Sequence, residues 1–338
     1  MQLDVSLPGG DLRKSAALAR QWEDIGIGRL WSSETQHDPF LSLAAATVTT
    51  ERIGLGTSIA IAFSRSPMAV AHAAWDLQRA SGGRFILGLG TQVKAHNERR
   101  FSVPWTAPMP RLREVVRALH AIWDCWQTGA KLNFHGEHYR FDLMTPFFNP
   151  GPIDALPPPV YLAAVNEQMA RLAGEVADGL HVHSLHSARY IAEVLKPAVA
   201  DGLVIGGRAG AAFRLHARVF TIVGDTAGER ARVRENTRRQ IAFYASTRTY
   251  ARVLAVHGWE NVVARLHELS LHGEWKSMAS LITDEMLDVY AVTGTWDDIG
   301  VRVRERYAGL LDRVSLRGLE DVPPGDPRWA RILKGVTA

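Results

Sequence analysis

Short apolar runs rich in β-branched residues recur along the chain, and most are followed by a helical pattern of hydrophobic positions. The candidate strands are Leu3–Leu7, Arg29–Ser33, Ile53–Ile61, Phe85–Gly90, Val160–Ala164, Gly179–His183, Arg214–Val223 and Arg313–Leu316. Amphipathic stretches lie at 11–25, 39–51, 67–81, 108–127, 167–177, 187–201, 226–245 and 296–309. Alternating strands and helices indicate parallel βαβ units, and eight units predict a closed (β/α)8 TIM barrel in the α/β class. A doubly wound open sheet is the rival arrangement.

Capping residues at several helix starts support this register. Asp38 and Ser66 each precede a proline that would occupy the first helical position. Asn166 precedes another helical run, and Thr295 with Asp298 resembles a capping box.

Two connections are much longer than the others. One lies between the fourth and fifth strands and contains a proline-rich stretch, and the other lies between the seventh and eighth strands. We interpret them as a loop excursion at about 128–158 and a helical insertion at about 226–292 on a single domain, residues 1–338.

Composition excludes several classes of protein. The 39 Lys and Arg residues against 35 Asp and Glu residues leave a net charge of +4, too small and scattered for a nucleic-acid platform. The one cysteine, Cys125, excludes an internal disulfide and a thiolate zinc cage and suits a reducing compartment. Neither a signal peptide nor a membrane-spanning apolar run is evident, so we expect a cytoplasmic protein with no membrane or nucleic-acid partner.

In a (β/α)8 barrel the active site is built from the loops that follow the strands. Glu34 and His37 follow the second strand. A partly buried Glu34 would suit proton transfer, and a structural pair with an arginine is an equally good interpretation. His37 carries an imidazole that titrates near neutral pH and is the other candidate for proton transfer, with a merely solvated loop histidine as the alternative.

Asn166 opens a helix whose free N–H groups form a potential anion site, although an ordinary N-cap without a ligand is the alternative. His181, His183 and His186 have a spacing that resembles a metal cluster. Because the first two share a strand face and the third begins the next loop, we expect no metal there.

Four segments resemble, in order and spacing, the bacterial luciferase-like superfamily of flavin- and deazaflavin-dependent oxidoreductases: 30–40, 53–67, 77–91 and 159–179. The Thr57-Ser58-Ile59 and Gly90-Thr91 steps look most like the branch that uses coenzyme F420, a 5-deazaflavin. The resemblance implies an F420-dependent oxidoreductase that transfers a hydride between the deazaflavin and a small organic substrate.

The same resemblance implies roles for individual residues. Ser58 and Ile59 would form a cis-peptide bulge that backs the cofactor ring, while Thr91 and Asn97 would contact the ring or its ribityl chain. The phosphate would be held by the helix start, with these side chains close by: Asn166, Gln168 and Ser184. The rim cations that would receive an acidic cofactor tail are Arg65, Lys94, Arg99 and Arg100.

Two alternatives to an F420 enzyme stay open. One is an FMN-dependent monooxygenase supplied with reduced flavin by a separate reductase, and the other is a non-catalytic flavin-binding protein. The non-catalytic alternative is favoured by Thr35, because many relatives have at this position a histidine that assists proton transfer. Five aromatic residues are available to line an apolar substrate pocket, with core packing or lid contacts as the alternative for most of them: Phe40, Phe63, Trp105, Phe147 and Phe148. By analogy with relatives we expect a homodimer.

Overall fold

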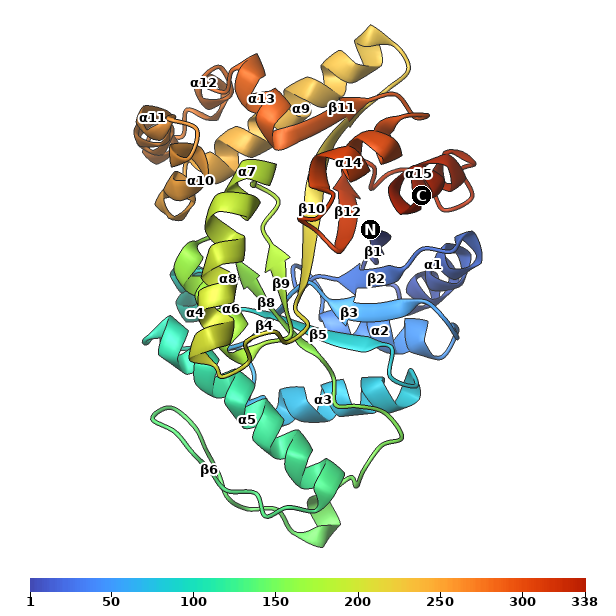
Figure 1. Cartoon of the computed structure of the whole chain (residues 1–338), viewed down its shortest axis with the longest axis vertical. Helices are drawn as coiled ribbons and strands as arrows, with labels where there is room; N and C mark the ends of the chain where they lie inside the picture. The colour runs from blue at the N-terminus through green and yellow to red at the C-terminus, as the bar shows by residue number, and fades with distance from the viewer.

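Eight parallel strands close a barrel in the computed structural model, which describes all 338 residues (Figure 1). The strands follow one another in the order β1 (Gln2–Ser6), β2 (Arg29–Ser32), β3 (Gly54–Thr57), β5 (Phe85–Gly90), β8 (Val160–Ala164), β9 (Gly179–Val182), β10 (Arg214–Val223) and β12 (Arg313–Arg317). The first and last strands pair, with Gln2 opposite Arg313. The predicted (β/α)8 barrel is confirmed, and the open sheet is excluded.

Helices follow the strands as the pattern predicts: α1 (Leu12–Ile25), α2 (Pro39–Thr47), α3 (Pro67–Ala80), α4 (Lys94–Arg100), α5 (Pro108–Thr128), α6 (Glu167–Val176), α7 (Ala188–Tyr190), α8 (Lys196–Ile205), α14 (Ile299–Tyr307) and α15 (Arg328–Thr337). A π-helical segment, η2 (Ile191–Leu195), joins α7 to α8. Thr295 and Asp298 bond each other's backbone N–H groups, as a capping box does. None of the helices is long and apolar enough to cross a membrane.

The predicted third strand, Ile53–Ile61, is interrupted. It forms β3 up to Thr57 and then β4 (Ala60–Ile61), which pairs with β5. Between them the Ser58–Ile59 peptide bond is cis, as the resemblance implied. Ser58 and Ile59 are partly exposed, whereas Thr57 and Ala60 on either side are buried.

The long connection after β10 forms the helical insertion: α9 (Ala227–Ala245), η3 (Arg248–Tyr250), α10 (Ala251–Ala255), α11 (Glu260–Leu271), α12 (Trp275–Ala279) and α13 (Asp284–Tyr290). Figure 1 shows these helices grouped at one end of the molecule. They lead into a further parallel strand, β11 (Ala291–Gly294), which pairs with Phe220–Val223 of β10. The strand pattern missed β11, which begins within the stretch that we interpret as a helical insertion.

The connection after α5 forms a hairpin, β6 (Phe134–His135) and β7 (Arg140–Phe141), and a short 3-10 turn, η1 (Pro146–Phe148). Figure 1 shows this excursion at the opposite end of the molecule from the insertion. Phe147 and Phe148 are 89% and 66% exposed. The expectation that they line a substrate pocket is therefore wrong, since η1 lies on the outer surface.

Candidate functional site

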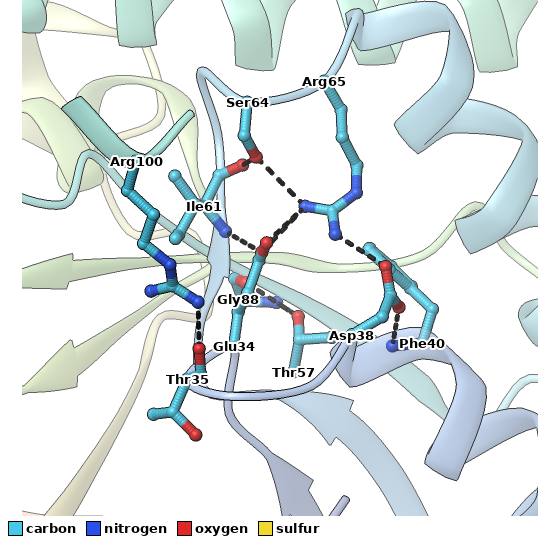
Figure 2. Close-up of polar contacts among 10 residues, drawn as sticks. All are labelled: Glu34, Thr35, Asp38, Phe40, Thr57, Ile61, Ser64, Arg65, Gly88 and Arg100. Atoms are coloured by element: carbon cyan, nitrogen blue, oxygen red, sulfur yellow. Dashed lines mark hydrogen bonds and ion pairs between the residues drawn. The ribbon is translucent and has the colours of Figure 1, made fainter. Parts of the chain in front are cut away.

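Glu34 lies just after β2, where an arginine and a backbone N–H hold it (Figure 2). Its Oε2 accepts a hydrogen bond from the Ile61 N–H at 2.7 Å, and Arg65 Nη1 donates to its two oxygens at 2.9 and 2.7 Å. Arg65 Nη2 donates to Asp38 Oδ2 at 2.6 Å. Two carboxylates therefore neutralise the Arg65 guanidinium, and the expectation that Arg65 receives an acidic cofactor tail is wrong.

Of the two interpretations of Glu34, these contacts show the structural pair with an arginine. The side chain joins the loop after β2 to the end of β4, and the residue is only 8% exposed. Proton transfer by Glu34 stays a prediction. His37 is exposed and lies against the turn after β1, so close to Gly9 that a Cβ there would be 2.9 Å from the His37 Cβ. Both candidate proton donors therefore lie at the carboxyl end of the barrel.

The second strand also holds the Ser58–Ile59 step in place. Ser33 Oγ donates to the Ser58 carbonyl oxygen at 2.7 Å, and the Glu34 N–H donates to the Ile59 carbonyl oxygen at 3.0 Å. On the other side Gly90 packs so tightly that a Cβ there would lie 2.9 Å from Ile59 Cγ1. A side chain at position 90 would force Ile59 to shift. The Ser58–Ile59 step is therefore closely supported on both sides, and we call it the ledge.

Asn97 on α4 lies against the loop that contains Thr91, and the predicted contact of both residues with a cofactor stays a prediction. The Asn97 side chain is fully buried, and its Nδ2 donates to the carbonyl oxygens of Thr91, at 2.8 Å, and of Val93, at 3.1 Å. Its Oδ1 is buried without a partner. The amide donors are therefore used by the loop, and one acceptor remains for a ligand.

The start of α6 has the features of an anion site. Asn166 Oδ1 accepts from the Met169 N–H at 3.0 Å, so the N–H groups of Glu167 and Gln168 have no acceptor within the helix. Arg252 reaches this point from α10 and pairs with Glu167 at 3.4 Å. Ser184, at the end of the neighbouring β9, is 7% exposed, whereas Gln168 is exposed.

The three histidines of β9 and its loop do not converge on a metal. His181 Nδ1 lies 2.9 Å from His216 Nδ1 inside the barrel, whereas His183 Nε2 lies 3.1 Å from the Tyr250 hydroxyl. His186 Nδ1 bonds the His183 carbonyl oxygen at 2.8 Å. Burial lowers the pKa of His181 and of His183 to about 3, and the pKa of His186 to about 4, so all three are neutral near pH 7.

One group of side chains has the spacing of metal ligands: Glu114, Glu137 and His138. The Glu114 carboxylate, however, accepts three backbone N–H bonds from residues 137–139, at 2.8 to 3.1 Å. These bonds lower the pKa of Glu114, although partial burial opposes them. The carboxylate therefore anchors the tip of the hairpin to α5.

Sequence reasoning missed the residues that the insertion brings to the barrel mouth. Tyr244 and Tyr250 pack edge-on against His183, with ring centroids 4.7 Å away in each case. Arg317 ends β12, and its guanidinium lies over the Tyr244 ring at 5.4 Å. No local signal marks these residues, because they meet only once α9 and η3 fold onto the barrel.

The open end of this parallel barrel therefore carries both the supported Ser58–Ile59 step and the start of α6. The family model described as luciferase-like monooxygenase matches residues 2–313, and this chain belongs to that family.

Known proteins align with this chain over most of their length. An uncharacterized protein of Mycobacterium tuberculosis is 48% identical over 314 residues, covering 93% of this chain and 92% of the relative. The 5,10-methylenetetrahydromethanopterin reductase of Archaeoglobus fulgidus is 28% identical, covering 90% and 87%. The structure of coenzyme F420 dependent tetrahydromethanopterin reductase from Methanopyrus kandleri superposes with a TM-score of 0.76 at 20% identity, covering 99% and 97%.

Proposed function

We propose that this protein is an F420-dependent oxidoreductase that transfers a hydride between the deazaflavin and a small organic substrate. The observation that carries the proposal is the partly exposed Ser58–Ile59 ledge at the carboxyl end of the barrel, at the same end as the α6 start. The relatives named as F420-dependent or methanopterin reductases support it.

The residues present fit a tricyclic ring with an anionic tail. The ledge is braced by Ser33 and Glu34 from one side and by Gly90 from the other, which supports a flat ligand. The orphan Asn97 Oδ1 suits an N–H donor of such a ring. The two free N–H groups at the α6 start suit its phosphate, and the helix dipole adds to the attraction.

A bound deazaflavin supplies the hydride chemistry, and the chain supplies position and proton handling. Glu34 keeps the ledge in place through Ile61 and Arg65. His37 lies three residues further along the same loop, and its side chain is exposed. We therefore assign His37 the proton transfer and Glu34 the positioning of the ledge.

Parallel titrations test the choice of cofactor. The purified protein, stripped of ligand, is titrated with F420 and with FMN while chromophore absorbance or fluorescence is followed. We expect saturable binding of F420 that is at least about tenfold tighter than that of FMN, a difference of about 1.4 kcal/mol. Tighter FMN binding would instead support a monooxygenase with a separate reductase.

Turnover separates an enzyme from a binding protein. Protein loaded with reduced F420 is mixed with a panel of carbonyl, alkene and imine acceptors, and reoxidation of the deazaflavin is followed. We expect at least one class to be reduced by the wild type and to be reduced much more slowly by His37→Phe. Binding of F420 with no reoxidation by any acceptor class would favour the non-catalytic alternative.

A further inference from the structure

Arg317 is the uppermost inward-facing residue of β12. Side chains two residues apart on a strand share one face, so Arg313, Ser315 and Arg317 line the same side. Arg313 pairs with the fully buried Asp4 at 2.6 Å, and Ser315 Oγ lies 3.1 Å from His216 Nε2. Both contacts lie inside the barrel, which places Arg317 on the inner face at the carboxyl end.

The Arg317 guanidinium is held in a fixed position. Its Nε donates to Gln240 Oε1 at 2.7 Å, and its plane lies over Phe220 at 5.1 Å and over Tyr244 at 5.4 Å. Its Nη1 is 3.5 Å from Ser184 Oγ, at the limit of a hydrogen bond. The aromatic rings and the glutamine orient the guanidinium, and the edge of the group that points away from Nε stays available to a ligand.

No carboxylate neutralises this cation. Several arginines of the barrel have an acidic partner, as in Arg313 with Asp4, Arg218 with Glu320 and Arg65 with Glu34. The buried Arg29 instead donates to the backbone carbonyl oxygens of Leu55 and Arg84. Arg317 forms no ion pair, although it is half-buried and Arg218 adds further positive charge nearby. Taking a cation partly out of water without a counter-ion is unfavourable, so such a group is typical of a site that receives an anion.

We propose that Arg317 binds an anionic group of the substrate, a carboxylate or a phosphate, while the body of the substrate packs against the partly exposed Tyr244. This inference rests on the proposed function, because the anion would belong to the substrate of that reaction. We assign the cofactor phosphate to the α6 start, which follows β8, whereas Arg317 ends β12 beyond β9 and β10. Ser184, expected near that phosphate, lies 3.5 Å from Arg317 Nη1, so the affinity for F420 is part of the test. A guanidinium fork matches a carboxylate or phosphate through two parallel hydrogen bonds.

The test is calorimetric titration of the F420-loaded protein with sodium benzoate, inorganic phosphate and the neutral isostere benzamide. We expect saturable benzoate binding, weaker phosphate binding because it lacks an apolar body, and benzamide binding at least about tenfold weaker than benzoate. Arg317→Met should weaken benzoate about tenfold or more, and Arg317→Lys less. Arg239→Met on the exposed side of α9 is the matched control and should change nothing.

Each other result overturns the inference. Equal binding of benzoate and benzamide, or no effect of Arg317→Met on benzoate, would show that no anion is recognised here. A loss of F420 affinity in Arg317→Met with unchanged benzoate binding would make Arg317 a cofactor contact. If F420 itself does not bind, the proposed function fails, and benzoate titration of the free protein still tests Arg317.

A measurement on the wild type guards against misfolding of the variants. Phenylglyoxal modifies exposed arginines, and the labelled peptides are quantified by mass spectrometry. Benzoate should slow labelling of Arg317 several-fold and leave Arg239 unchanged, whereas benzamide should protect neither. Equal labelling of Arg317 with and without benzoate would contradict the proposal.

Discussion

At the scale of single residues, the contacts of Glu34 explain why a polar group follows an apolar strand. The residue type and its place after β2 could be predicted from sequence, because both depend on local pattern. Its partner Arg65 lies 31 residues away along the chain. That pairing depends on how β2 and β4 align in space, and no local pattern encodes it.

Glu34→Gln should therefore destabilise the fold as well as the ledge. Loss of the charge leaves Arg65 with Asp38 alone, and we expect the free energy of unfolding to fall by about 1–3 kcal/mol. Urea denaturation measures it, with F420 affinity as a second reading. Glu268→Gln, in an exposed pair with Arg265 on α11, is the control and should stay within about 0.5 kcal/mol. An unchanged stability in Glu34→Gln would contradict the anchoring role.

The buried histidines predict how stability depends on pH. The pKa of His181 is about 3 in the folded protein, well below its ordinary value of 6.5, because burial disfavours the charged ring. The unfolded chain therefore binds more protons between these values, and stability falls as pH decreases below about 6.5. Each such histidine contributes up to about 1.4 kcal/mol per pH unit. Urea midpoints at pH 7.5, 6 and 5 should decrease in that order, and equal midpoints would contradict the burial.

At the scale of elements, helix starts were predictable and strand interruptions were less so. Asn166 caps α6 because an Asn side chain satisfies a free N–H at a helix start, which is a local rule. Apolar residues lie on both sides of the break between β3 and β4. The hydrophobic pattern alone therefore predicts a single strand there. The resemblance to a family, and not the pattern, indicated that Ser58–Ile59 was special.

Asn166→Ala should affect both the helix and the anion site. Loss of the cap should lower the free energy of unfolding by about 1 kcal/mol, and the frayed helix start should bind phosphate less well. F420 affinity should drop several-fold, whereas affinity for the deazaflavin chromophore that lacks the phosphate should not. Thr226→Ala removes the cap of α9 and is the matched control. Equal losses for both ligands would show that the α6 start does not hold the phosphate.

At the scale of the whole molecule, the barrel and its eight βα units could be predicted because strand-like and helix-like hydrophobic patterns alternate along the chain. These patterns reflect which side chains of each element are buried. The way the insertion covers the mouth could not be predicted, because the contacts of Tyr244, Tyr250 and Arg317 join segments that are distant in sequence. The proposed substrate site depends on those contacts. The sequence therefore offered candidate residues for the proposed cofactor site, but it did not indicate Tyr244, Tyr250 or Arg317.

The expected homodimer is a prediction at this scale. Helix α2 exposes Leu41 and Val48, which are 57% and 80% exposed, and burying such groups against a second copy would be favourable. Light scattering during gel filtration should give about twice the 37.3 kDa chain mass. A double change, Leu41→Glu with Val48→Glu, should shift the mass towards one chain. A wild type of single-chain mass would contradict the expectation.

A crystal structure with F420 bound tests the central claim most directly. We expect the ring to lie against Ser58 and Ile59, and a phosphate oxygen to lie within hydrogen-bonding distance of the Glu167 or Gln168 N–H. Density for the ring anywhere else, with the barrel mouth filled only by solvent, would contradict the account of how this chain positions its cofactor.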